Sequence, residues 1–174
     1  MVVFSMIQYP TISADDLFTL AKEAGTTGME WDDTVHLHAG RTHEATDAYW
    51  QAVRTNLAPV SLVSQYTLGS KRNIQEEFLP VIDCAFALHT SFIRIQPTPI
   101  PSAEAKFLTF NAAAQELRTI CDLANTFDME VHVIARPGTL TDTPESIRRL
   151  IKMANCRNFK CSWQPDPAVS DQDN

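Results

Sequence analysis

Short apolar runs alternate along the chain with segments that carry apolar residues at helical spacing. The apolar runs predict six buried strands, because each is short and bounded by polar or turn-forming residues. They lie at 2–8, 28–31, 59–65, 91–95, 130–135 and 159–165. Amphipathic helices are expected between them, from Ser13 to about Ala24, at about 43–56, from Asn73 to about Leu88, at about 103–127 and from Thr143 to about Ala154.

Several of these helices begin with residues that favour helix N-termini. Ser13 is followed three residues later by Asp16, and Asn73 is followed by Glu76, a spacing typical of capping pairs. Thr143 stands directly before a proline, which is tolerated in the first turn of a helix. These signals support a regular repeat of one strand followed by one helix.

A strand–helix repeat predicts parallel strands joined by right-handed helical crossovers. Spacing alone leaves a barrel and a doubly wound sheet open. No Gly-x-Gly-x-x-Gly or Walker-type loop follows a strand, which weighs against a nucleotide-binding sheet. A closed (β/α)₈ barrel has eight units and about 250 residues. The barrel alternative is an incomplete TIM-type α/β barrel of about six parallel strands over residues 1–165, followed by a polar tail at 166–174.

Composition narrows the classes of partner. The chain has 174 residues, of which 44% are apolar, and a net charge of −7. An acidic chain is a poor partner for nucleic acid, and no apolar run is long enough to span a bilayer. The amino terminus lacks the basic region of a signal peptide, so a cytoplasmic location is expected. The four cysteines form no C-x-x-C pair and are expected to be free, buried thiols.

In parallel α/β folds, functional side chains gather at the carboxyl ends of the strands. The residues expected there are polar and of mixed charge, which suits a small polar ligand such as a sugar. They are Glu30, Asp32, Asp33, Gln65, Tyr66, Arg94, Gln96, Arg136, Thr141, Asp142, Trp163 and Gln164.

Glu30 and Arg94 are the charged residues of two apolar strands. A buried arginine is costly unless it is paired. Glu30 is therefore either a general base or sugar-hydroxyl acceptor, or the ion-pair partner of Arg94. Arg94 is in turn either that partner or a clamp for a substrate anion.

His36 and His38 lie two residues apart after the second expected strand. In an extended segment both imidazoles point the same way and can reach one metal ion. A complete site needs a third ligand, for which Glu30 or Asp33 is available. The alternative is a solvated loop with two exposed histidines.

Four segments in order resemble the xylose isomerase-like TIM barrel family of sugar phosphate isomerases and epimerases. They are residues 28–36 (Gly-Met-Glu-Trp-Asp-Asp-Thr-Val-His), 92–94 (Phe-Ile-Arg), 138–143 (Gly-Thr-Leu-Thr-Asp-Thr) and 163–165 (Trp-Gln-Pro). The resemblance implies a divalent metal such as manganese, cobalt or zinc, held by acids on strands five, six and eight and a histidine on strand seven. It also implies proton or hydride movement between adjacent sugar carbons.

The sequence departs from that ligand pattern. Ile134 stands where the resemblance implies the strand-five acid, and Arg136 where a histidine follows. Gln164 stands where many relatives carry the strand-six acid. We therefore assign no metal ligand. Glu30 and His36 are the candidate catalytic residues, and the candidate substrate-binding residues are Tyr66, Arg94, Arg136, Trp163 and Gln164.

The expected activity is that of a sugar phosphate isomerase or epimerase, impaired or absent in this short chain. The alternatives are a non-catalytic sugar- or polyol-binding or interaction module, or a truncated fragment without a function of its own. Six strands leave two open sheet edges, which invite pairing with another chain. The expected partners are therefore a small sugar or polyol and a second copy or partner chain that covers the edges.

Overall fold

A computed structural model describes residues 2–69 and 73–163 of the chain. Six strands alternate with helices, as the hydrophobic pattern predicts. The strands are β1 (Val3–Ser5), β2 (Gly28–Asp32), β3 (Ala58–Thr67), β4 (Phe92–Gln96), β5 (Glu130–Ala135) and β6 (Phe159–Trp163). The helices are α1 (Ala14–Glu23), α2 (Thr42–Thr55), α3 (Ile74–Ala87), α4 (Phe107–Asn125) and α5 (Pro144–Ala154).

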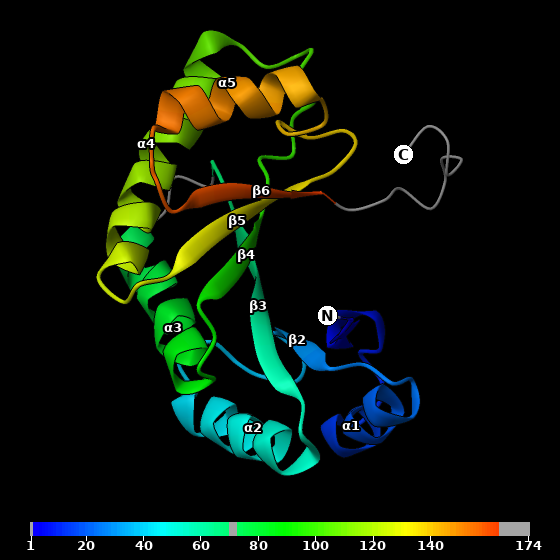
Figure 1. The fold of residues 1–174 in the computed structure, drawn as a ribbon. Coiled ribbons are helices and arrows are strands. Elements are labelled where there is room, and N and C mark those ends of the chain that lie inside the picture. The colour runs from blue at the N-terminus through cyan, green and yellow to red at the C-terminus, as the bar shows by residue number, and fades with distance from the viewer. Residues whose placement is uncertain (1, 70–72, 164–174) are drawn as a thin grey trace.

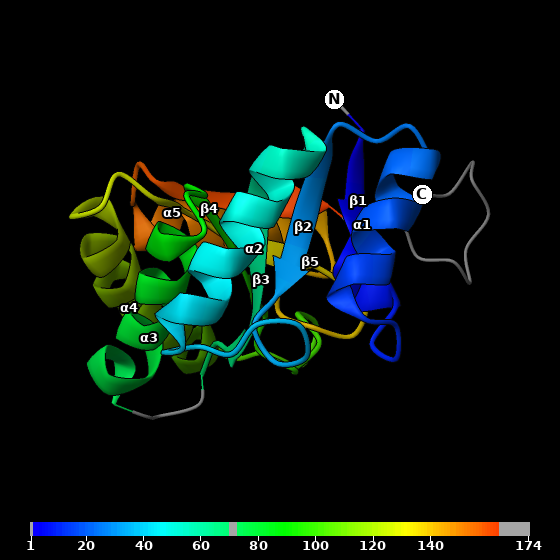
Figure 2. The same cartoon turned by 90° about the horizontal axis from the view of Figure 1, so that it is seen from below.

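The strands form one parallel sheet in the order β1-β2-β3-β4-β5-β6. Each strand therefore pairs with its neighbours in sequence, and β1 and β6 are the two edges. Figure 1 shows the sheet curving inside a crescent of helices, and Figure 2 shows the same arrangement from below. This is the arrangement of a partial TIM barrel, so the predicted fold class is confirmed.

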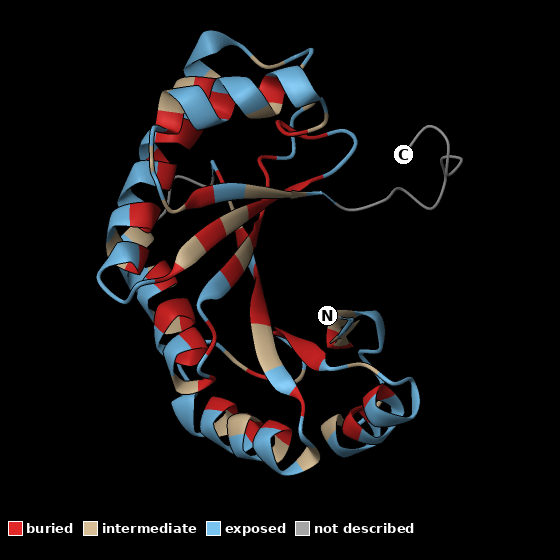
Figure 3. Ribbon diagram, in the orientation of Figure 1, coloured by how far each residue is buried: buried red, intermediate tan, exposed pale blue. Residues whose placement is uncertain are grey.

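The core lies between the convex face of the sheet and the helices. Residues at alternate strand positions, such as Trp31, Leu62 and Ile93, are fully buried there against the helices. Figure 3 shows this pattern as buried stripes on the strands and on the sheet-facing sides of the helices. The alternation follows from the period of two in a strand, which sends successive side chains to opposite faces.

Two of the expected helix starts have side-chain caps. The Ser13 hydroxyl accepts a hydrogen bond from the Asp16 backbone N–H at 3.3 Å. Thr143 and Ser146 form a reciprocal capping box at the start of α5. Asn73 is the N-cap of α3 but its side chain makes no capping bond, so that part of the predicted pair with Glu76 is wrong.

The first strand is shorter than predicted. Residues expected to continue it form a short 3₁₀ helix, Met6–Gln8, with a buried Met6 and a half-buried Ile7. The turn of the chain at this point brings Ile7 and Gln8 over the concave face of the sheet. Leu20 of α1 and Ile151 of α5 are each 39% exposed.

Candidate functional site

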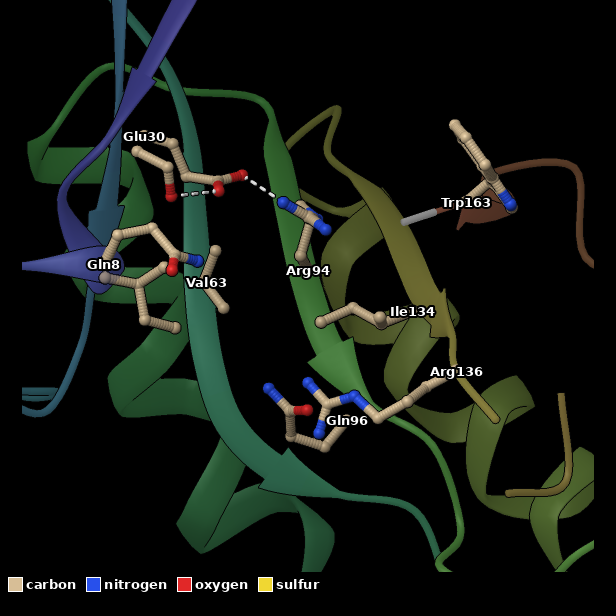
Figure 4. A pocket seen from close by; sticks show the side chains of 10 residues that line it. Gln8, Glu30, Val63, Arg94, Gln96, Ile134, Arg136 and Trp163 are labelled. Atoms are coloured by element: carbon tan, nitrogen blue, oxygen red, sulfur yellow. Dashed lines mark hydrogen bonds and ion pairs between the residues drawn. The ribbon is translucent and has the colours of Figure 1, made fainter. Parts of the chain in front are cut away.

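An ion pair lies at the centre of the concave face. Arg94 Nη1 donates to Glu30 Oε2 at 2.6 Å, and the Arg94 and Glu30 side chains are 19% and 8% exposed. Figure 4 shows the two side chains reaching toward each other from β4 and β2. Of the two roles left open for each residue, the structure shows the ion pair. The pair joins strands that are not adjacent in the sheet.

Three serines complete the hydrogen bonding of this pair. The Ser5 hydroxyl donates to Glu30 Oε1 at 2.8 Å, and the Ser61 hydroxyl donates to Oε2 at 2.7 Å. Arg94 Nε donates to the Ser162 hydroxyl at 3.3 Å. We call these five residues the interior network. It draws on β1, β2, β3, β4 and β6, and it keeps a buried charge pair well hydrogen-bonded, which such a pair needs.

The interior network borders a cavity of about 330 Å³ on the concave face. Its wall combines charged and amide groups with three aliphatic side chains and one tryptophan. The lining residues are Ser5, Ile7, Gln8, Glu30, Val63, Arg94, Gln96, Ile134, Arg136 and Trp163. Such a mixture of a few polar groups and an apolar surface is typical of small-molecule sites.

The structure brings together four of the predicted site residues at this cavity: Glu30, Arg94, Arg136 and Trp163. Trp163, at the end of β6, is 62% exposed and lies at the rim. In Figure 4 its ring points away from Arg94 and Ile134. The predicted residue Gln164 lies outside the described residues.

Tyr66 does not line this cavity. Its hydroxyl donates to Glu116 Oε1 of α4 at 2.7 Å, and its ring packs edge-on against Phe78 of α3. Glu116 also accepts the Gly69 backbone N–H at 2.8 Å. Tyr66 therefore lies on the helix-facing side of β3, where it joins the strand and the following loop to α4. The sequence placed it correctly at a strand end but not on the concave face.

His36 and His38 are directed to different partners. One ring nitrogen of His36 contacts the Ile12 carbonyl at 3.2 Å, whereas His38 pairs with Glu44 Oε2 at 2.9 Å. Neither residue lines the cavity. The loop after β2 turns rather than extends, so the geometry that would aim both imidazoles at one ion is not formed.

Two acids at the end of β2 have structural roles. Asp32 Oδ1 accepts hydrogen bonds from the Thr34 backbone N–H at 2.9 Å and hydroxyl at 2.6 Å, which fixes the turn after the strand. Asp33 Oδ1 accepts the Gln65 backbone N–H at 3.1 Å. Burial raises the pKa of Asp33 above its ordinary value, although hydrogen bonds from Ser64 and Gln65 act in the opposite direction.

The described side chains do not suit a divalent metal. Residues 2–69 and 73–163 contain no group of three or more His, Cys, Asp or Glu side chains placed to hold an ion. At the end of β5, an apolar Ile134 and a cationic Arg136 face the cavity, and a guanidinium repels a metal cation. We therefore derive no step through a metal.

The thiols are free, as predicted. Cys84 and Cys121 are buried, and Cys156 and Cys161 are half-buried. Burial raises the pKa of Cys84 and of Cys161 to about 12, so both remain protonated at neutral pH. A protonated thiol is a weak nucleophile. These residues are packing groups rather than candidates for covalent chemistry.

Sequence reasoning missed the three serines and Gln8. Serines in a strand carry no distinctive pattern, and only the alternation of strand positions could have placed Ser61 on the same face as Glu30's carboxylate. Gln8 was not identified because the first strand was expected to continue through it. Ser5 lies opposite Glu30, which only the strand register shows. Ser162 pairs with Ile134 of β5 and reaches Arg94 across that strand.

The fold is similar to that of several solved structures. The structure matches the probable 3-DHS dehydratase AsbF of Bacillus anthracis with a TM-score of 0.82 and 21% identity, over 93% of this chain. It matches a xylose isomerase domain-containing protein of Salmonella typhimurium LT2 with a TM-score of 0.72 and 13% identity, over 92% of the chain. It matches a D-psicose 3-epimerase crystallised with D-fructose with a TM-score of 0.75 and 11% identity, over 92% of the chain.

The chain thus has the fold of the xylose isomerase-like TIM barrels, as the sequence resemblance implied. It spans 62%, 58% and 62% of the lengths of these three proteins. No protein-family model matches the sequence, and a comparison with curated proteins finds no match. Within the described ranges, no helix combines the length and apolar character needed to cross a bilayer.

Proposed function

We propose that the cavity binds a small sugar or polyol, and that the chain descends from sugar isomerase or epimerase chemistry with little or no turnover of its own. The observation that carries the first part is the pairing of hydrogen-bonding groups with an apolar wall. Glu30, Arg94 and Gln96 offer acceptors and donors, and Val63 and Ile134 offer a surface for C–H groups. A carbohydrate presents both kinds of surface.

Arg94 supplies donors beyond those used in the ion pair. A guanidinium has five N–H groups, and the hydrogen bonds to Glu30 and Ser162 account for two of them. The remaining donors and the cavity-lining Gln96 amide can serve ligand hydroxyls. The structural similarity to a D-psicose 3-epimerase crystallised with D-fructose supports a ligand of this class.

Low turnover is expected because the carboxylate of Glu30, the candidate base, is already hydrogen-bonded within the protein. Both carboxylate oxygens of Glu30 already accept hydrogen bonds. Oε1 accepts one from Ser5, and Oε2 accepts one from Ser61 and one from Arg94. A general base must instead be within reach of the proton that it removes. Glu30 therefore serves in this proposal as a binding and structural group, and His36, outside the cavity, has no role in ligand contact.

Isothermal titration calorimetry with D-glucitol and D-fructose tests the binding function. We expect saturable binding of at least one of them, unchanged by EDTA or added Mn²⁺. Gln96→Met removes hydrogen bonds and should weaken binding about 2–10-fold, the range expected for one net hydrogen bond. Gln115→Met on the exposed side of α4 makes the same chemical change away from the cavity and should have no effect.

Two results would refute parts of this proposal. Binding that disappears with EDTA and returns with Mn²⁺ would show a metal site and restore the catalytic interpretation. Conversion of D-fructose to an epimer by the chain alone, followed by NMR, would show that the low-turnover part is wrong.

A further inference from the structure

Among the described residues that line the cavity, Arg136 is the charged residue without a partner. Arg94 is neutralised by Glu30, whereas Arg136 forms no ion pair or side-chain hydrogen bond with any residue in the described part of the chain. The charged side chains that line the cavity therefore sum to about one positive charge, although the whole chain carries −7. A local cation in an acidic protein attracts an anion to this place in particular.

The backbone that carries Arg136 is held firmly. The Thr139 hydroxyl donates to the Arg136 carbonyl at 2.6 Å, and the Thr141 hydroxyl donates to the Ile134 carbonyl at 2.8 Å. The Leu140 backbone N–H donates to the Thr98 carbonyl at 3.0 Å, which ties this loop to the one after β4. The base of the side chain is therefore positioned in advance, while its guanidinium remains exposed to a ligand.

Gln96 provides a second, independent sign of a ligand. The residue is 9% exposed, and within the described residues its Oε1 has no hydrogen-bond partner. Nε2 donates to the Ser64 carbonyl over a long 3.4 Å. A buried amide that is only partly satisfied costs free energy. Rotation about its broad terminal torsion turns either amide group toward the cavity that it lines.

The two residues lie toward the same end of the cavity. They come from the carboxyl ends of neighbouring strands, since β4 ends at Gln96 and β5 ends just before Arg136. Figure 4 shows Gln96 and Arg136 together, with Glu30 toward the other end and Ile134 between. A ligand that spans the cavity would meet a cation and an amide at one end and the interior network at the other.

We propose that the ligand is a polyhydroxylated carboxylate, with its carboxylate on Arg136 and the adjacent hydroxyl on the Gln96 amide. This deepens the proposed function and rests on it. A carboxylate carries one charge and accepts two parallel N–H bonds from one guanidinium. A phosphate monoester carries about −1.5 to −2 and three acceptor oxygens, which calls for more than the one unpaired cation in the described lining.

Three probes of similar size separate these possibilities: D-gluconate, neutral D-glucitol and D-glucitol 6-phosphate. We expect D-gluconate to bind at least about 10-fold more tightly than D-glucitol in calorimetric titrations at low salt, a ratio equivalent to about 1.4 kcal/mol. The preference should shrink at 0.5 M NaCl because Arg136 is exposed and its charge is screened. Sodium acetate serves as the control for unspecific carboxylate binding.

Arg136→Gln is the decisive variant. It should abolish the preference for D-gluconate over D-glucitol. The fold should be retained, since an exposed side chain contributes little to folding. Arg54→Gln makes the same change of charge on the exposed side of α2 and should keep the full preference.

Each other outcome overturns the proposal in a distinguishable way. Equal affinity for D-gluconate and D-glucitol would remove the anion subsite but leave polyol binding intact. Tighter binding of the 6-phosphate would replace the carboxylate with a phosphate. A preference that survives in Arg136→Gln would assign the anion to another group, and no binding of any probe would refute the proposed function as well.

Discussion

The two faces of the sheet are made by the same strands yet differ sharply in chemistry. On the helix-facing side, Met29, Leu62 and Ile93 are fully buried in one apolar core. On the concave side, their immediate neighbours Glu30 and Arg94 form a hydrogen-bonded ion pair. Parallel strands are usually apolar on both faces. The concave face departs from that rule in one region, and that region is where the cavity lies.

One set of alternate strand positions builds the apolar core, and the other carries the polar groups of the cavity. Sequences that violate local rules tend to do so at functional sites. Here the violation is a charged layer where barrel interiors usually hold branched apolar residues. Changes on the two faces should accordingly have different consequences, and the following experiments separate them.

The largest effect is expected on the helix-facing side. Phe78 of α3 is fully buried and packs against Tyr66. Phe78→Ala should lower the free energy of unfolding by about 3–5 kcal/mol, measured by urea denaturation. Phe86→Ala, on the same helix but 62% exposed, is the matched control and should cost well under that amount. Equal costs would mean that the helix-facing core is not the main source of stability.

On the concave face, the free energy of unfolding should depend on the balance of charge in the ion pair rather than on side-chain volume. Arg94→Met leaves Glu30 buried without its cation, which should cost about 3 kcal/mol or more. The double variant Glu30→Met/Arg94→Met removes both charges and should recover much of that loss. A double-mutant cycle measured by urea denaturation gives the coupling. Additive losses would show that the pair contributes nothing as a unit.

The smallest effect is expected from the buried carboxyl group of Asp33. Asp33 is buried beside α3, and burial raises its pKa. The bound proton stabilises the fold fully below the ordinary pKa of about 3.8. That stabilisation is lost as pH rises through the folded-state pKa. At pH 7 the charge is therefore a cost, and Asp33→Asn should raise the urea midpoint slightly.

The pH dependence provides the check on this last variant. The gain from Asp33→Asn should shrink as pH falls toward 4, because wild-type Asp33 then becomes neutral as well. Asp47→Asn, at an exposed position of α2, should show neither the gain nor the trend. A gain that is constant with pH would point to packing rather than to the buried charge.

The helix-facing side could be predicted from the sequence almost completely. Apolar residues at alternate strand positions and at helical spacing define β5 to the residue, and the other strands to within a few positions. The sequence predicts a first strand that is too long, because a short apolar run has the same pattern in a strand and in a 3₁₀ helix. Periodicity cannot distinguish the two over three residues.

The concave face could be predicted only in part. The cost of burying Arg94 indicated a partner, and Glu30 is that partner. The serines that complete the network are common residues without a local signal, and the register that places them is a property of the whole sheet. Tyr66 was expected at the ligand because it lies at a strand end, but one position along a strand decides which face a side chain meets.

The order of strands in the sheet also bears on how the chain folds. Val3 pairs with Gly28, and Val131 pairs with Phe159, so every strand finds its partner within the preceding strand–helix unit. The entropy cost of closing such a crossover loop rises only slowly with its length. The sheet can therefore grow one unit at a time from the amino terminus as the chain leaves the ribosome. In that order of growth, the interior network would be completed last, when Ser162 of β6 reaches Arg94.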